Sequence, residues 1–154
     1  MISAPSASSA DRPPVFGANS FPGPDGGVSL WAKNMATQDR CCSIVPYFQV
    51  SSGQLPAFQA LCEQFVARTQ SEAKCLYYGF SFDGDVVHCR EGYTDAEGVL
   101  AHLENVGPIL QEALKISTIL RLEIHGPESE LAQLRGPLSG LAPQFFVLEY
   151  GFRR

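Results

Sequence analysis

The sequence predicts an α+β protein built on a split β-α-β arrangement. Three observations lead to this fold class. Segments with strand-like alternation and segments with helical spacing follow one another in the order β-α-β-β-α-β. A tight turn at Asp83-Gly84 joins the two middle strands, because glycine tolerates the positive φ of such turns. A helix-start signal at Thr94 and Glu97 then separates the third strand from the second long helix.

The 154 residues suit one compact domain, which we place at residues 39–154. Residues 1–38 are rich in Ser, Ala, Pro and Gly and cannot bury enough apolar surface to offset the entropy of ordering them. They are predicted to form a disordered or loosely ordered leader without the apolar core of a secretion signal. Local packing of Phe16, Phe21 and Trp31, and targeting to an organelle, both stay open as alternatives.

The first half of the domain reads as strand, helix and hairpin. Residues 42–50 alternate, with Ile44, Phe48 and Val50 on one face and Val45, Tyr47 and Gln49 on the other. After the Ser51–Gly53 turn, Pro56 is tolerated in the first turn of a helix that reaches about Thr69. Residues 75–82 and 86–93 form the two strands of the hairpin.

The second half repeats a helix and a strand and then adds one more of each. The second long helix opens at a Thr94/Glu97 capping box, is expected to break near Gly107-Pro108 and then resumes. A fourth strand covers Ile119–His125, a short helix carries Leu131, Leu134 and Leu138, and Phe145–Phe152 is expected to be the last strand. This element order is that of a ferredoxin-like fold with an antiparallel sheet.

The composition excludes several classes of function. A net charge of −5 argues against nucleic-acid binding, and no apolar run approaches the roughly 20 residues that cross a membrane. Five cysteines without CxxC spacing predict reduced, buried thiols, a cytoplasmic location and no metal site. There is no Gly-rich dinucleotide loop either, so no cofactor is expected.

One face of the predicted sheet has no helix to cover it. If the aliphatic rows meet the helices, that face carries a mixture of aromatic and charged side chains: Tyr47, His88, Arg90, Arg121, Glu123 and His125. A solvated face with charges paired across strands is one interpretation. The other is that two copies pack sheet against sheet as a homodimer.

The segment from Glu91 to His102 resembles the antibiotic biosynthesis monooxygenase superfamily. In those proteins a strand ends in Glu-x-aromatic, an acidic turn follows, and the next helix carries a histidine; here these are Glu91, Tyr93 and His102. The resemblance covers about residues 42–154 and implies a dimeric α/β barrel, with the last strand exchanged toward the partner. It further implies a pocket between the helices and the sheet. Haem is not expected, because the haem-degrading members use a Trp, and here the corresponding aromatic is either Tyr93 or absent.

The candidate catalytic residues are His102, Tyr93 and Glu91. Histidine exchanges protons near neutral pH, and His102 lies in the apolar stripe of its helix; a boundary histidine bonded to Asn105 is the alternative. Glu91 would hold His102 in one tautomer or pair with Arg90. The candidate substrate-binding residues are Tyr47, His88, Arg90, Asn105, Arg121 and His125.

The resemblance implies a cofactor-independent monooxygenase acting on a small aromatic or quinol substrate. His102 would remove a proton, and the resulting anion would pass an electron directly to O2. The alternative is a non-catalytic dimer that binds a small molecule or acts as a stress-associated interaction protein. Convergent polar groups in the pocket would favour the enzyme, and a cavity filled by Phe and Leu would favour the second possibility.

Overall fold

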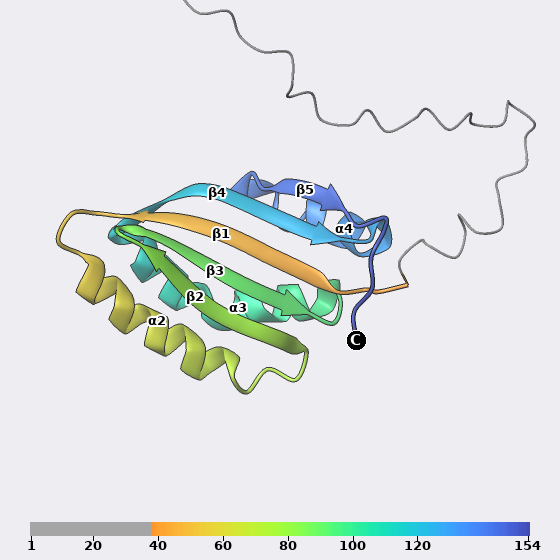
Figure 1. Ribbon diagram of the computed structural model, residues 1–154, viewed down its shortest axis with the longest axis horizontal. Coiled ribbons are helices and arrows are strands. Elements are labelled where there is room, and N and C mark those ends of the chain that lie inside the picture. The colour runs from red at the N-terminus through yellow and green to blue at the C-terminus, as the bar shows by residue number, and fades with distance from the viewer. Residues whose placement is uncertain (1–37) are drawn as a thin grey trace, which may run out of the picture.

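The computed structural model describes residues 38–154, so the predicted leader lies outside the described residues except for its last position. Five strands and three helices form the domain (Figure 1). In chain order they are β1 (Cys42–Val50), α2 (Leu55–Thr69), β2 (Cys75–Asp83), β3 (Val86–Tyr93), α3 (Ala96–Lys115), β4 (Ser117–Gly126), α4 (Glu128–Arg135) and β5 (Gln144–Val147). A 3-10 helix at Ser139–Leu141 connects α4 to β5.

The strands form one sheet in the order β2-β3-β1-β4-β5. The first four pair antiparallel, which confirms the ferredoxin-like core of the prediction. The last strand differs from the prediction in two respects, because it ends at Val147 and it runs parallel to β4 of its own chain. The connection through α4 is a crossover, and a crossover brings the next strand back in the same direction.

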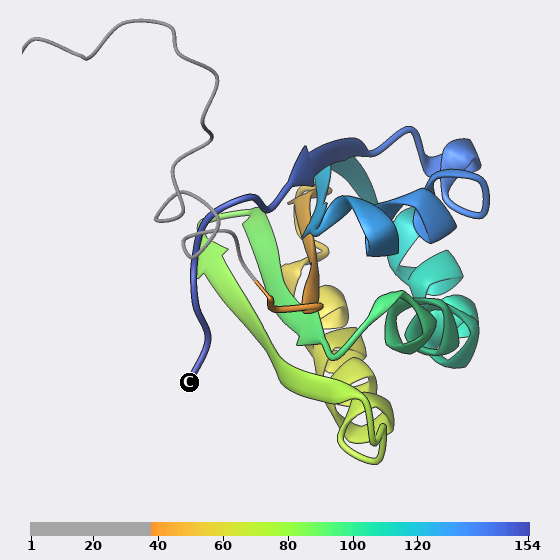
Figure 2. The same cartoon turned by 90° about the vertical axis from the view of Figure 1, so that its right-hand side faces the viewer.

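All three helices cover the same face of the sheet, and the other face is left open (Figures 1 and 2). On β1, residues of even number are buried and those of odd number are half-buried, as the alternation predicts. Ile44, Phe48 and Val50 therefore face the helices, while Tyr47 lies on the open face with His88 stacked on it at 4.5 Å between ring centroids. The chain after β5 runs along this open side (Figure 2).

A β-bulge shifts the phase of β4. Tyr47 pairs with Arg121, but the next residue of β1, Phe48, pairs with Ile119. Strict alternation along β4 would place Leu120 in one aliphatic row with Leu122 and Ile124. The bulge displaces Leu120 from this row and leaves it 57% exposed, whereas Leu122 and Ile124 are buried against the helices. A bulge adds one residue to one strand, so the alternation changes face at that point.

The second long helix begins and continues differently from the prediction. Its N-cap is Asp95, whose Oδ1 accepts a hydrogen bond from the Gly98 amide at 2.9 Å, and Glu97 bonds Lys74 instead of completing a capping box with Thr94. The helix also runs unbroken through Pro108. Pro108 is exposed, so water can bond the carbonyl that a proline leaves without an amide partner.

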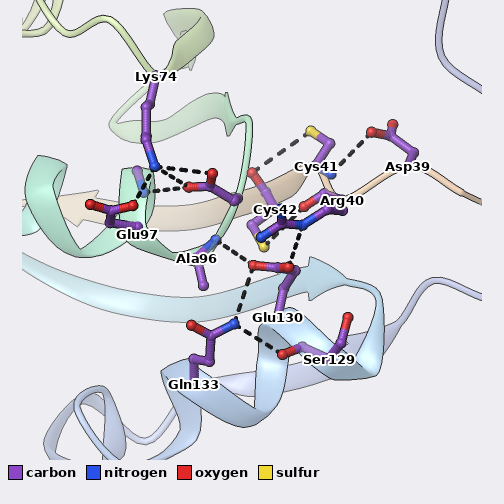
Figure 3. A network of polar contacts seen from close by, with 12 residues as sticks. Asp39, Arg40, Cys41, Cys42, Lys74, Ala96, Glu97, Ser129, Glu130 and Gln133 are labelled. Carbon is purple, nitrogen blue, oxygen red and sulfur yellow. Dashed lines mark hydrogen bonds and ion pairs between the residues drawn. The ribbon is translucent and has the colours of Figure 1, made fainter.

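A network of charged groups fastens β1 and α4 to the start of α3 (Figure 3). The Glu130 side chain is only 4% exposed and accepts hydrogen bonds from the Ala96 amide at 2.9 Å and from Arg40 Nε at 2.7 Å. These bonds hold the pKa of Glu130 below its usual value, with Arg40 the main cause. A carboxylate at a helix N-terminus is favourable because the first amides of the helix have no partner within it.

Among residues 38–154, no helix is both long and apolar enough to cross a membrane.

Candidate functional site

A small cavity lies between α3 and the helix-covered face of the sheet. Its volume is about 50 Å³, and Leu141, in the 3-10 helix, is its most exposed lining residue. The cavity separates two hydrophobic clusters of the core, one containing Ile44 and Leu122 and the other Phe48 and Val106. The remaining walls are Pro46, Phe65, Tyr78, Phe80, Cys89, Glu91, His102, Leu103, Leu110, Ile119, Ile124, Leu138 and Leu141.

Two ionisable groups, Glu91 and His102, stand out among these apolar walls. Glu91 follows Val87 and Cys89 in the row of β3 that faces the helices, a position where an aliphatic residue would be usual. His102 lies in the buried stripe of α3 between Val99 and Val106. Local structure therefore places both side chains inside the core, where an ionisable group is retained only with partners.

The two nitrogens of His102 contact two different carboxyl groups. Nδ1 lies 3.1 and 3.0 Å from the two carboxylate oxygens of Glu72, and Nε2 lies 3.2 Å from Glu91 Oε2. A carboxylate only accepts hydrogen bonds, so Nδ1 carries the proton and donates to Glu72. In the neutral ring Nε2 is then an acceptor that faces Glu91.

Tyrosines enclose the same pair. The Tyr93 hydroxyl donates to Glu91 Oε2, and its ring lies 5.0 Å from the His102 ring between centroids. The Tyr78 ring also contacts the His102 ring, at 5.4 Å between centroids. Burial raises the pKa of both tyrosines above the usual value, so both hydroxyls stay protonated as donors.

Burial changes the pKa of the two cavity groups in opposite directions. It raises the pKa of Glu91 to about 8, against the hydrogen bond from Tyr93, and the charge of Glu72 adds to the rise. It lowers the pKa of His102, against the attraction of Glu72. Near neutral pH the carboxyl therefore keeps its proton while the imidazole is neutral. An acid and a base thus stand side by side in one cavity.

Four of the residues predicted from the sequence come together here: Glu91, Tyr93, His102 and Asn105. The Asn105 side chain reaches the Glu72 carboxylate, with Nδ2 donating to Oε1 at 2.6 Å. The other five predicted binding residues lie across the sheet on the open face: Tyr47, His88, Arg90, Arg121 and His125. The structure does not bring these five to the cavity.

The open-face residues interact mainly with one another. The guanidinium of Arg121 lies 5.9 Å from the Tyr47 ring centroid and bonds Glu123, and the ring of His125 stacks on Phe146 at 4.9 Å. Arg90 lies over the Tyr77 ring at 5.2 Å. These contacts describe a surface of paired charges and stacked rings.

Glu72 is the site residue that sequence reasoning missed. It sits in the turn after α2, thirty positions from His102, and no local pattern marks it out from the other acidic surface residues. Only the packing of α2 against α3 brings it to the histidine. Among residues 38–154, no group of three or more His, Cys, Asp or Glu side chains is arranged to hold a metal ion.

Comparison with solved structures places the fold among known proteins. MupZ from Pseudomonas fluorescens is 48% identical over 77% of this chain and 92% of that protein, with a TM-score of 0.73. A conserved protein of unknown function from Bacteroides thetaiotaomicron, described as a possible oxidoreductase, is 15% identical over 56% of this chain and 96% of that protein, with a TM-score of 0.52. The second likeness shows the fold alone.

Similar structures also include one with the family name that the sequence motif suggests. A putative antibiotic biosynthesis monooxygenase from Chloroflexus aurantiacus is 17% identical over 56% of this chain and 92% of that protein, with a TM-score of 0.49. No protein-family model matches the sequence, and no curated protein sequence does.

Proposed function

This chain belongs to the family of MupZ, and we propose that it is an enzyme of acid–base chemistry acting on a small, largely apolar substrate. The observation that carries the proposal is the pairing of Glu91 with His102 at one side of an otherwise apolar cavity. Groups whose environments push their pKa values apart can take the roles of acid and base. His102 is the proposed base at Nε2, and Glu91 is the proposed acid.

The pKa values favour these roles at neutral pH. A base must be unprotonated to act, and burial lowers the pKa of His102. An acid must hold a proton, and the pKa of Glu91 is raised to about 8. Tyr93 acts as a positioning residue, because its hydroxyl donates to Glu91 Oε2, the same oxygen that lies 3.2 Å from His102 Nε2.

The cavity restricts what can enter. A cavity of about 150 Å³ holds benzene, and this one, at about 50 Å³, holds only a few waters. A ring-sized substrate therefore requires its rim to open. Leu141 is the place to expect this, since it is 40% exposed and belongs to a one-turn helix between α4 and β5.

The reaction that we propose for this site is cofactor-independent oxygenation of a phenolic or quinol-type substrate. His102 takes the phenolic proton, the phenolate passes one electron to O2, and the radical pair combines at a ring carbon. Glu91 protonates the peroxide, and loss of water leaves a quinone. The balance is one phenol plus O2 giving one quinone plus water, with one oxygen atom of O2 in each product.

A second candidate is a non-catalytic protein that binds a small apolar molecule. The observation in its favour is the composition of the cavity wall, in which aliphatic and aromatic side chains far outnumber the two ionisable ones. In that case Glu91 and His102 would fix a ligand by hydrogen bonds without proton transfer.

The test uses phenol and 1-naphthol as probes under 18O2. We expect binding by ligand-observed NMR and 18O in the quinone by mass spectrometry. His102→Asn and Glu91→Gln are expected to lower turnover by about 10²–10⁴-fold, the range of general acid–base groups. His125→Asn on the open face is the matched control and should keep the rate.

Two results would overturn the oxygenase. Binding of either probe without 18O in any product supports the second candidate. Full turnover by both cavity variants removes the acid–base assignment altogether.

A further inference from the structure

The ionisable pair in the cavity is connected to the protein surface through the far side of the histidine ring. Nε2 of His102 faces Glu91 at 3.2 Å, and Nδ1 lies 3.0 Å from Glu72. The side chains of Glu91 and His102 are 5% and 3% exposed, and that of Glu72 is 14% exposed. The three groups therefore form one line from the cavity to water.

The outer end of this line is held in place by two helices. Asn105 on α3 donates to Glu72 Oε1 at 2.6 Å. Arg68 on α2 donates through Nη1 to the Asn105 carbonyl at 2.8 Å, and Asn105 Nδ2 is also 3.4 Å from the Arg68 carbonyl. The turn that carries Glu72 is thus fixed against the turn of α3 that follows His102.

We propose that Glu72 is the solvent-side proton carrier of a relay that connects the cavity to solvent through His102. The proposal rests on the proposed function, since it says where the proton taken by His102 goes. The ring accepts a proton from the substrate at Nε2 and releases the Nδ1 proton to the Glu72 carboxylate. Glu72 then passes that proton to water, so that each N–H or O–H bond broken is matched by one formed.

The burial of His102 explains why a relay is needed. An imidazolium in the core is unfavourable, which is why the pKa of His102 is lowered. Without an outlet the captured proton would leave a charged ring beside the substrate. Transfer to Glu72 restores a neutral ring, in the tautomer with Nε2 protonated. The Nε2 proton passes to the Glu91 carboxylate that remains once the peroxide is protonated, and Glu72 returns a proton from water to Nδ1, which resets the ring for the next turnover.

The simpler interpretation is that Glu72 only orients the ring. Orientation needs a hydrogen-bond acceptor at the Glu72 position, and a carboxamide oxygen provides one. A relay needs a group that can itself gain and lose a proton, which a carboxamide cannot do. Glu72→Gln therefore separates the two roles, and Glu104→Gln makes the same change of charge at an exposed position of α3.

Other groups near the ring also act on its proton. Those that face His102 or its two carboxyl partners from the packed elements are Tyr78 and Cys75 on β2, Cys89, Glu91 and Tyr93 on β3, Asn105 on α3 and Glu72 itself. Glu72 is the only carboxylate of this set that is not nine-tenths buried.

The first experiment needs no substrate. Long-range 1H–15N correlation on protein labelled at histidine reports the tautomer of each of the three rings, with His102 assigned by its absence in His102→Asn. We expect His102 to be neutral with the proton on Nδ1 at pH 7. In Glu72→Gln the Nδ1-protonated form should persist, because the carboxamide oxygen still accepts from Nδ1. Glu104→Gln should match the native spectrum.

The second experiment measures turnover of phenol or 1-naphthol, whichever gives an 18O-labelled quinone. Glu72→Gln should lower kcat by about tenfold or more at unchanged KM, less than the ~10²–10⁴-fold loss at the acid or base itself. Added formate should restore part of the rate, because a small acid can carry the proton in place of the missing carboxylate. If Glu72→Gln does not fold, Asn105→Ala loosens Glu72 without removing it and should lower kcat by a smaller factor.

The relay is overturned if native His102 carries its proton on Nε2, if Glu72→Gln shifts the ring to that form, or if Glu72→Gln keeps the native kcat. Full activity of His102→Asn and Glu91→Gln would instead contradict the proposed function. The two failures are therefore distinct.

Discussion

At the scale of single residues, burial raises the pKa of Glu91 and lowers the pKa of His102. Each side chain would be charged for part of the physiological pH range in water, yet the core favours the uncharged form of both. Two neutral groups that can exchange one proton cost less to bury than an ion pair. The same arrangement makes the fold itself sensitive to pH.

We predict that Glu91 destabilises the fold as the pH rises. Its pKa is raised from 4.5 to about 8. The protonated carboxyl therefore makes its full contribution to the free energy of unfolding below pH 4.5, and this contribution is lost between pH 4.5 and pH 8. The shift corresponds to at most about 5 kcal/mol. Glu91→Gln removes the ionisation, so its stability relative to the native protein should grow from pH 5 to pH 8.

Urea unfolding at pH 5, 6.5 and 8 measures this difference. The pKa of His102 is lowered, so its own contribution is lost as the pH falls below 6.5, but both proteins carry that histidine and the difference largely cancels it. Glu104→Gln is the control for a change of charge alone. Unfolding free energies of Glu91→Gln and native protein that stay parallel with pH would contradict the prediction.

Sequence reasoning singled out Glu91 and His102, the proposed acid and base, although it expected Glu91 to hold the His102 tautomer or pair with Arg90, and it did not find Glu72. Glu91 and His102 could be identified from the sequence because a family-like motif and the apolar stripe of a helix both point to them. Glu72 could not, because its role depends on two helices meeting across thirty residues of chain. Likewise, strand phase correctly grouped Tyr47, His88 and Arg121, but it could not say which face would enclose a cavity.

At the scale of elements, the start of α3 depends on Asp95. Asp95→Ala removes the bond to the Gly98 amide and should lower the free energy of unfolding by about 0.5–2 kcal/mol. Thr94→Ala should have little effect, because the side chain that caps the helix is that of Asp95. Thermal unfolding of both variants is the measurement. An equal loss at Thr94 would restore the capping box that the sequence suggested.

Most element bounds followed from the sequence, and the exceptions have local causes. The three strands from β1 to β3 begin and end within a residue of the prediction, since alternation and turn residues agree there. Pro108 did not break α3, because tertiary packing holds the helix on both sides of it. The segment after Phe145 looked like a long strand because it is apolar, but only Gln144–Val147 pairs with β4.

At the scale of the whole molecule, the open face of the sheet is the largest unexplained surface. It presents Tyr47, His88 and Arg121 at its centre, with both signs of charge, and the aromatic side chains of Tyr150 and Phe152 are 67% and 82% exposed on the segment that runs along the same side (Figure 2). A surface with both charges and aromatics can be complementary to itself. We propose that a second copy covers it.

The predicted oligomer is a homodimer of twice 16.7 kDa in light scattering. Tyr47→Glu gives each copy a carboxylate at the centre of the proposed interface. The repulsion between the two carboxylates should yield monomers. Phe82→Glu is the matched control, since Phe82 is an exposed aromatic of β2 in the helix-side row. A native protein that runs as a monomer would leave the face available to a different protein and would remove the barrel.

The ion pair between Asp39 and Arg153 has a consequence for how this domain can be rebuilt. It joins the first and last parts of the described chain, with Nη2 of Arg153 3.0 Å from Asp39 Oδ1. In a protein cut to residues 39–154, ends that meet in this way could be connected by a short linker, and new ends could be opened in an exposed turn such as Ser51–Gly53. A circular permutant of this kind would begin at α2 and finish with β1, yet its cavity would keep every wall.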